Sequence, residues 1–176
     1  MKPQTEILDL LRGGDRRSIG GSDQAAQIVS RNPKLFFKLI AGLWSDDALI
    51  RMRAADAAEK VSRENPALLR THKRELLELL SEADEQELRW HLAAMIPRLN
   101  LNPAELKQAA GTLKLYLQDR SSIVKTFALQ ALADLAQRDA ALWPEVIELL
   151  REAERTGTPA MRARSRNILR KLERIS

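Results

Sequence analysis

The chain has 176 residues, of which 44% are hydrophobic and 4% aromatic, and its formal net charge is +5. This length and this apolar content suit one compact domain with a sizeable buried core. The absence of cysteine excludes disulfides, zinc–thiolate sites and thiol catalysis. The N-terminus does not have the pattern of a signal peptide and no apolar run is long enough to span a bilayer, so we expect a cytoplasmic protein without a membrane partner.

Helix-forming residues dominate the sequence, and no segment alternates apolar with polar residues as a half-buried strand would. We therefore predict an all-α chain. In chain order the expected helices span residues 5–12, 22–31, 33–44, 47–63, 66–81, 85–99, 103–117, 121–137, 140–154 and 159–174. Several of them begin with an Asn-Pro or Thr-Pro pair, which places a capping side chain before a proline of the first turn.

A glycine-rich segment, residues 13–21, separates the first two expected helices and holds four of the seven glycines. Glycine permits left-handed backbone conformations, and Arg16 and Arg17 beside a helix start form a candidate anion-binding pair. The segment lacks the Gly-Lys-Ser/Thr ending of a P-loop. We favour a tight connecting loop over an anion site, and both interpretations stay open at this point.

A sequence repeat organises the rest of the chain. Segments that begin at Ile50, Leu88, Val124 and Met161 follow one another at spacings of 38, 36 and 37 residues and share one apolar helical face. Paired helices of this kind bury their apolar faces by stacking side by side. We expect one domain over residues 1–176, with an N-terminal helix and loop (1–21), stacked helix pairs (22–154) and a basic capping helix (155–176).

An acidic residue precedes the apolar–basic pair of three repeats, and the fourth repeat has the basic residue alone. The residues concerned are Asp47 with Arg51, Asp84 with Arg89, Asp119 with Lys125, and Arg162. Over about residues 22–174 this pattern resembles the HEAT-repeat family. The resemblance implies a right-handed α-α superhelix of about four to five helical hairpins, in which the basic residues reach the Asp of an adjacent unit as an internal ladder. It says little about function, because that family includes scaffolds, transport factors, lyases and DNA-repair enzymes.

Trp90 lies opposite the core-facing Leu88 on the helical wheel, and Pro97 falls on the same side. With Met52 and Leu129 of neighbouring repeats it forms a mildly apolar band, a candidate partner-binding surface. The alternative is that the twist between repeats tucks Trp90 against a neighbouring unit. The other aromatic side chains are expected to pack internally: Trp44, Trp143, Phe36, Phe37, Phe127 and Tyr116.

The C-terminal segment carries most of the positive charge, since residues 155–176 contain seven basic residues and one acid. Arg166, Arg170 and Arg174 lie four residues apart on one helical face and are candidate anion-binding residues. A polar cap on the stack is the alternative interpretation. The exposed sides of the second helices carry mixed charges, which counts against a nucleic-acid groove there.

The sequence has no arrangement of His and carboxylates with metal-ligand spacing and no nucleophile-elbow motif. We therefore predict a non-enzymatic scaffold or adaptor, without metal or cofactor, that binds a protein or peptide. A nucleic-acid-binding module is the first alternative. A DNA glycosylase of the HEAT-like kind is a weaker one, implied by the family resemblance, the three tryptophans and the high isoelectric point.

Overall fold

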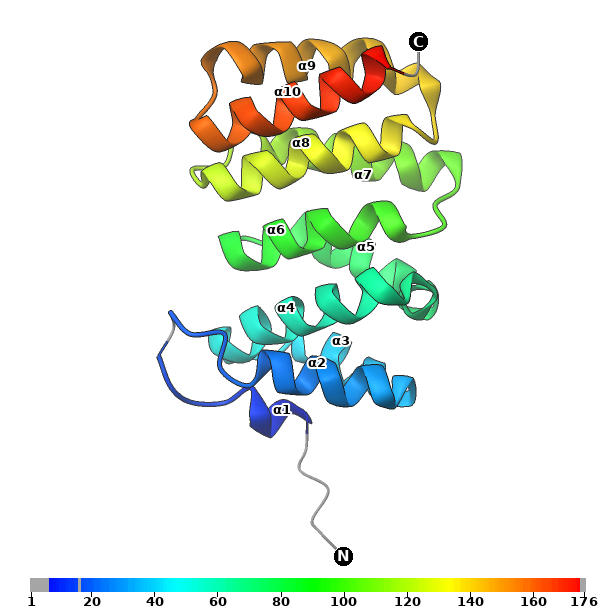
Figure 1. Ribbon diagram of the computed structural model, residues 1–176. Coiled ribbons are helices and arrows are strands. Elements are labelled where there is room, and N and C mark those ends of the chain that lie inside the picture. Colours follow the sequence, from blue (N-terminus) through cyan, green and yellow to red (C-terminus); the bar gives the residue numbers. More distant parts are fainter. Residues whose placement is uncertain (1–6, 16, 175–176) are drawn as a thin grey trace, which may run out of the picture. The chain divides into compact units, whose positions relative to one another are not determined.

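The computed structural model describes residues 7–15 and 17–174, and every regular element within these ranges is a helix, as the sequence predicts (Figure 1). Arg16 and the first two residues of the expected helix 5–12 lie outside the described residues. The chain divides into two compact units, residues 1–74 and residues 75–176. The prediction of one domain of stacked pairs stays a prediction.

Helix α4 is the centre of the first unit. The elements of this unit are α1 (Ile7–Leu10), α2 (Ser22–Arg31), the 3-10 helix η1 (Pro33–Leu35), α3 (Phe36–Gly42), α4 (Ala48–Glu64) and the 3-10 helix η2 (Pro66–His72). Both α2 and α3 pack against α4, whose inward side carries the fully buried Ala54, Ala57 and Ala58. The short helix α1 docks on α2 and α3 through the buried Ile7 and Leu11.

Helix α8 is the centre of the second unit. The chain passes into this unit along α5 (Lys73–Glu82), and the remaining elements are α6 (Gln86–Met95), η3 (Ile96–Arg98), α7 (Pro103–Tyr116), α8 (Ser122–Ala136), η4 (Ala140–Leu142), α9 (Trp143–Thr156) and α10 (Pro159–Glu173). Helices α6, α7, α9 and α10 all contact α8, and α6, α8 and α10 lie side by side in Figure 1. Because it has neighbours on most sides, α8 buries nine of its residues.

Of the predicted helix N-caps, some make a side-chain capping bond and others do not. Asn102 forms a complete capping box, in which its side chain accepts from the Glu105 N–H at 2.9 Å and the Glu105 carboxylate accepts from the Asn102 N–H at 2.8 Å. Asn32 and Asn65 make no side-chain capping bond, and the expected helices 33–44 and 66–81 begin instead with the 3-10 helices η1 and η2.

The expected helix 85–99 also differs from the structure. Its α-helical part ends at Met95, and a 3-10 helix continues to Arg98. The cause is Pro97, which has no N–H for an α-helical hydrogen bond and crowds the carbonyl of the preceding turn.

Candidate partner-binding surfaces

The structure places Trp90 against a neighbouring helix. Its ring centroid lies 5.0 Å from that of Phe127 on α8, with the two rings tilted by 40°. Trp90 is half-buried, and so is Pro97. Leu129 is only 2% exposed, because α8 is packed on several sides. Leu129 therefore drops out of the predicted apolar band, since no partner reaches it in the folded chain. The remaining member, Met52, belongs to the first unit and is half-buried.

The packing around Trp90 continues onto α10. The Arg164 guanidinium lies 5.6 Å from the Phe127 ring centroid, a cation–π arrangement. Arg164 also donates to the Gln130 side chain at 3.3 Å, and Gln130 donates to the Asp134 carboxylate at 2.8 Å. Burial raises the pKa of Asp134, although this hydrogen bond and the nearby Arg164 oppose the rise. The band around Trp90 is thus engaged within the chain, which favours the second interpretation of this residue.

One rung of the predicted ladder is present in the second unit. Arg89 donates through Nη1 to the Asp119 carboxylate at 2.6 Å and through Nε to the Ala83 carbonyl at 2.7 Å. The Asp119 side chain is 8% exposed. Its burial raises the pKa, but hydrogen bonds from the Ser121 N–H and from Arg89, together with the charges of Arg89 and Lys125, lower the pKa below its ordinary value. The pair holds the loop before α8 against the start of α6.

Asp47 and Arg51, also predicted for the ladder, make contacts beside the start of their own helix. Asp47 caps its own helix by accepting from the Leu49 N–H at 2.8 Å, and Arg51 donates to the Ser45 carbonyl. Arg51 and Arg89 thus each reach the carbonyl six residues before them, and so anchor the loop that precedes their own helix. Asp84 and Arg162 are exposed. Arg51 and Arg89 therefore each anchor a loop, and Arg89 also pairs with Asp119; the repeat pattern did not indicate the loop contacts.

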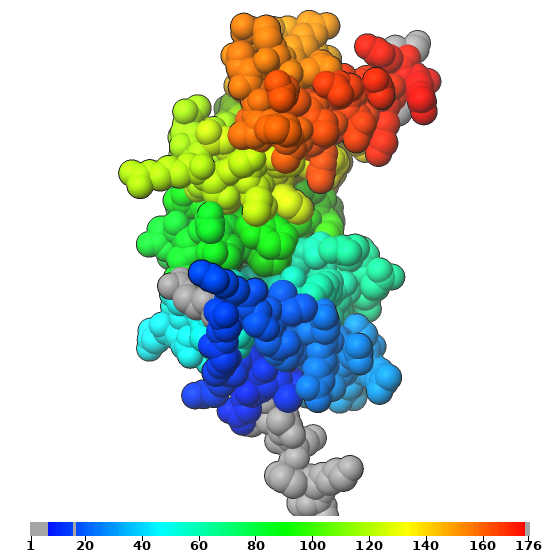
Figure 2. Space-filling view, turned by 60° about the vertical axis from the view of Figure 1, so that its left-hand side comes forward, coloured from blue at the N-terminus to red at the C-terminus, as the bar shows by residue number. Residues whose placement is uncertain are grey.

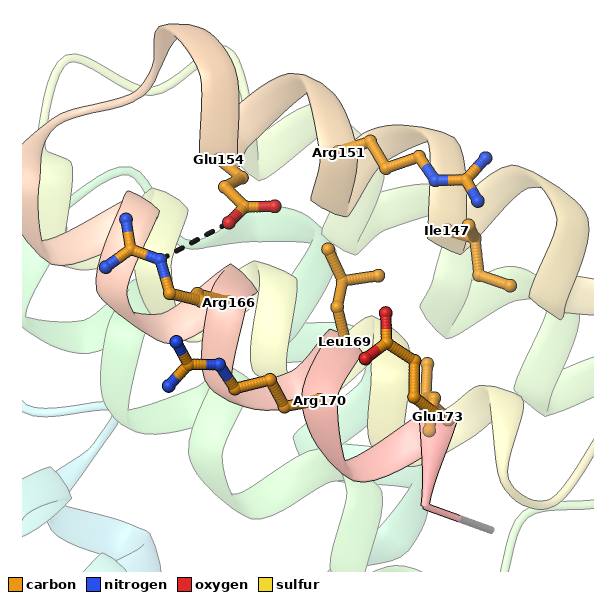
Figure 3. Close-up of a pocket in the computed structure, with 8 residues that line it drawn as sticks. Ile147, Arg151, Glu154, Arg166, Leu169, Arg170 and Glu173 are labelled. Carbon is orange, nitrogen blue, oxygen red and sulfur yellow. Dashed lines mark hydrogen bonds and ion pairs between the residues drawn. The ribbon is translucent and has the colours of Figure 1, made fainter. Parts of the chain in front are cut away.

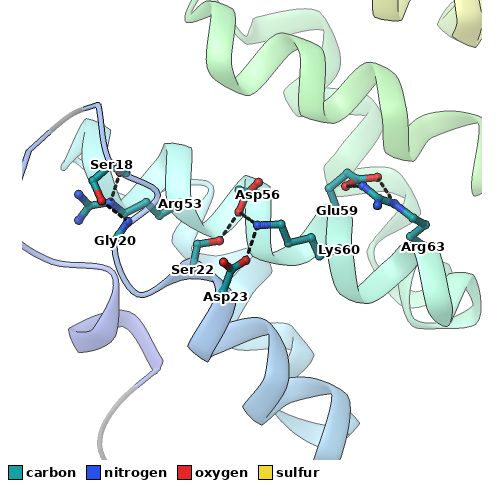
Figure 4. A network of polar contacts seen from close by, with 9 residues as sticks. All are labelled: Ser18, Gly20, Ser22, Asp23, Arg53, Asp56, Glu59, Lys60 and Arg63. Atoms are coloured by element: carbon teal, nitrogen blue, oxygen red, sulfur yellow. Dashed lines mark hydrogen bonds and ion pairs between the residues drawn. The ribbon is translucent and has the colours of Figure 1, made fainter.

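The glycine-rich loop wraps around a buried arginine of α4 (Figure 4). Arg53 is 1% exposed, and its guanidinium donates to three carbonyls of the loop, those of Gly13, Asp15 and Ser18, and to the Leu11 carbonyl just before it. Arg53 is not among the site residues predicted from the sequence. One indication of its role was visible there: Arg53 lies among small and apolar residues of the repeat, and a charged residue in such surroundings needs a partner.

This arrangement shows what the loop binds. An anion site would present N–H groups, but here the carbonyls point inward at a cation. The loop N–H groups are used locally: that of Arg17 donates to the Asp15 carboxylate at 2.9 Å and that of Gly20 to the Ser18 hydroxyl at 3.0 Å. Arg17 itself is exposed, and Arg16 lies outside the described residues. The contacts with Arg53 favour the interpretation of the described part of the segment as a connecting loop, and an anion site at Arg16 and Arg17 stays a prediction.

A second polar network ties the start of α2 to α4 (Figure 4). Lys60 lies 2.6 Å from Asp23 and 2.5 Å from Asp56, and the buried Ser22 hydroxyl also donates to Asp56. Burial lowers the pKa of Lys60, but the hydrogen bonds to the two carboxylates outweigh it and raise the pKa above its ordinary value. The charges of this network are therefore satisfied within the first unit.

Two aromatic side chains of the first unit lie in solvent, contrary to the prediction that they pack. Phe37 of α3 is 55% exposed, and Trp44, in the turn directly after α3, is 42% exposed. The neighbouring Phe36 is 2% exposed. Adjacent residues of a helix point about 100° apart, so one ring of a Phe-Phe pair can be buried while the other lies in solvent. The sequence alone did not decide this, because the adjacent Leu39 and Ile40 of the same helix are both buried.

We use the name α3 face for the exposed side that these aromatics share. It consists of Lys34, Phe37, Lys38, Ala41 and Trp44. Lys34, Phe37, Ala41 and Trp44 are exposed and Lys38 is half-exposed, whereas Leu39, Ile40 and Leu43 on the opposite side are buried. The α3 face thus combines two aromatic anchors with two positive charges on a helix that the core holds in place.

The arginines of α10 are exposed on the second unit. Arg162, Arg166, Arg170 and Arg174 all lie at the surface, and the α10 residues form the orange-to-red part of it in Figure 2. A groove of about 670 Å³ lies between α9 and α10 (Figure 3). Three arginines, two glutamates and three aliphatic side chains line it, and Arg166 lies 3.3 Å from Glu154 across it. The groove itself has mixed charge, whereas the outer side of α10 is basic.

Two further properties concern the described residues alone. They contain no group of three or more His, Asp or Glu side chains placed to hold a metal ion. None of their helices combines the length and apolarity that a membrane crossing requires.

Comparisons with protein-family models, with curated proteins and with solved structures found no match to this chain. The resemblance to HEAT repeats therefore rests on the sequence pattern alone.

Proposed function

We propose that the chain is a non-enzymatic scaffold, built as a HEAT-like solenoid of helix pairs, that binds a protein or peptide through the α3 face. The observation that carries the proposal is the exposure of Phe37 and Trp44, at 55% and 42%, on one side of a helix whose other side is buried. Large aromatic side chains are rarely left in solvent together, and they supply a large share of the energy of protein interfaces.

The α3 face is preorganised for binding. The buried Phe36, Leu39 and Ile40 fix α3 on α4, so the two exposed rings start from a rigid backbone. Phe37 lies in α3 and Trp44 in the turn that follows its last residue, Gly42, so about two helical turns, roughly 10 Å, separate them. A partner gains two apolar contacts without the cost of ordering a loop.

Charges around the α3 face set the chemistry and direction of the partner. Lys34 and Lys38 lie beside Phe37, whereas the exposed Asp46 and Asp47 follow Trp44. A complementary segment carries two apolar side chains about two helical turns apart, with acidic residues near Phe37 and basic residues near Trp44. This charge gradient along α3 favours one orientation of the bound segment.

A site-specific crosslinking experiment tests the proposal. The full chain is made with a photoreactive phenylalanine analogue at position 37 or at position 115, where Leu115 is 72% exposed on α7 and provides a control. Irradiation in an extract of the source cells is followed by identification of the adducts. We expect one protein to crosslink from position 37 and not from position 115, and to disappear with Trp44→Ala. Identical adducts from both positions would show that exposed residues are labelled without a specific partner.

A further inference from the structure

We propose that the second unit has an anion-binding surface of its own, the outer face of α10, and that it binds the phosphate backbone of nucleic acid. This surface, the α10 basic face, consists of Arg162, Arg166, Arg170 and Arg174. It is independent of the α3 face, which belongs to the first unit.

The arginines of the α10 basic face form a row along the helix. Its four arginines follow at intervals of four residues, so successive side chains lie about 6 Å apart along the helix and on neighbouring directions around it. All four are exposed, whereas Ser165 and Ile168 on the opposite side are buried against α8 and α9. The packing of α10 therefore holds a line of guanidinium groups in solvent.

Few carboxylates neutralise this row. Between residues 155 and 174 the only acid is Glu173. Within residues 7–15 and 17–174, the single ion pair of the row joins Arg166 to Glu154 at 3.3 Å, with the two side chains 49% and 37% exposed. A pair this open to solvent is worth about 0–1 kcal/mol, so a phosphate displaces the glutamate readily. Figure 3 shows Arg166 turned toward Glu154 and Arg170 extending beside it from the next turn of α10.

The side chains between the arginines indicate the class of ligand. Pro159, Ala160, Ala163 and Asn167 are exposed with them, and none of the large exposed hydrophobic residues of the described chain lies on α10. The core of a protein interface needs apolar anchors, which the α3 face has and α10 lacks. Phosphate contacts need only donors, and the arginine fork binds phosphate oxygens in pairs.

The contacts available also predict how selective the binding is. Arginine contacts to phosphate position a nucleic acid without reading its sequence. The described residues of α10 include no aromatic side chain on which a base could stack. We therefore expect similar affinities for unrelated sequences and a strong dependence on salt.

Fluorescence anisotropy of the full chain with labelled 20-nucleotide single strands and duplexes tests this inference. Two to four phosphate contacts give a slope of log K against log salt of about −1.8 to −3.6, so the Kd for duplex rises about 10- to 150-fold between about 50 and about 200 mM salt. Arg166→Gln with Arg170→Gln flattens the slope by about 2. Lys107→Gln with Arg31→Gln removes the same charge from exposed positions of α7 and α2 and leaves binding within about twofold.

Three results overturn the inference. The first is the absence of binding at the lower salt, and the second is an equal loss of affinity in the α10 variant and the control variant. The third is tighter binding of labelled poly-glutamate than of nucleic acid, which would assign the surface to an acidic protein. Phe37→Ala must leave nucleic-acid affinity unchanged, so failure here is distinguishable from failure of the α3 proposal. Circular dichroism of each variant checks that it is folded.

Discussion

The guanidinium of Arg53 occupies the space that a β-carbon on Gly20 would need. An added β-carbon would lie 2.6 Å from Cζ of Arg53, closer than such atoms approach in folded proteins. Gly20 also has a φ of +53°, in the left-handed region that favours glycine. The loop of residues 13–21 and the buried arginine of α4 are thus matched in shape as well as in hydrogen bonding.

This match predicts that two glycines of the same loop respond differently to alanine. Gly13 also has a positive φ, +69°, but a β-carbon there meets nothing within 4 Å. Gly13→Ala should lower the free energy of unfolding by about 1 kcal/mol through backbone strain alone. Gly20→Ala should cost about 2–4 kcal/mol, because the Arg53 guanidinium must also move. Urea unfolding measures both, and equal costs would show that Arg53 does not fill the loop.

Removal of the Arg53 guanidinium should release the loop. Arg53→Met leaves four carbonyl acceptors without their donor, and we expect it to lower the free energy of unfolding by about 3 kcal/mol or more. Hydrogen exchange of the amides at 17–22 should become faster. Arg151→Met is the matched control, because Arg151 is 66% exposed and pairs on the surface of α9 with Glu148, which is 74% exposed. Unchanged exchange in Arg53→Met would contradict the role assigned to this residue.

The Arg89–Asp119 pair should make stability depend on pH in the acid range. The folded state lowers the pKa of Asp119, so its contribution is complete above the unfolded pKa near 4 and is lost as the pH falls through the lower folded value. Asp119→Asn should cost about 1–3 kcal/mol at pH 7, because Arg89 loses its charged partner. The difference between variant and wild type should shrink below about pH 4. A difference that is constant from pH 7 to pH 3 would contradict this account.

The contribution of Asp134 to stability should depend on pH with the opposite sign to that of Asp119. Burial raises the pKa of its carboxyl in the folded chain, so ionisation at neutral pH disfavours folding and protonation favours it. Asp134→Asn keeps an acceptor for Gln130 and removes the charge, so it should raise the stability at pH 7, with no gain at a pH below the unfolded pKa. Thermal unfolding at pH 7 and pH 3 measures this. A loss of stability at pH 7 would show that the attraction of Arg164 outweighs burial.

Much of the local structure followed from the sequence. The last helix, expected over residues 159–174, spans Pro159–Glu173, and the predicted caps at Asn102 and Thr158 are present. These features depend on residues close together in the chain, such as a capping side chain and the N–H two or three positions later. Local preferences of this kind can be read directly from the residue order.

Contacts between distant residues could not be read in the same way. Whether Trp90 faced a partner or a neighbour depended on Phe127, one repeat later, and the pattern allowed both. The role of Arg53 depended on the path of a glycine-rich loop whose conformation no periodicity fixes. At the α3 face the periodicity allowed two outcomes, since the adjacent Leu39 and Ile40 are both buried, whereas of Phe36 and Phe37 only Phe36 is.

Affinity for the partner that crosslinks at position 37 is the most direct test of the α3 face. Titration calorimetry with that purified partner compares the wild type, Phe37→Ala, Trp44→Ala and the control Leu115→Ala. All three substituted side chains are exposed, so each variant should stay folded. The account predicts that each α3 substitution weakens binding at least about tenfold, as for interface anchors, and that Leu115→Ala has no effect. Unchanged affinity of the Phe37→Ala/Trp44→Ala double variant would contradict the proposal.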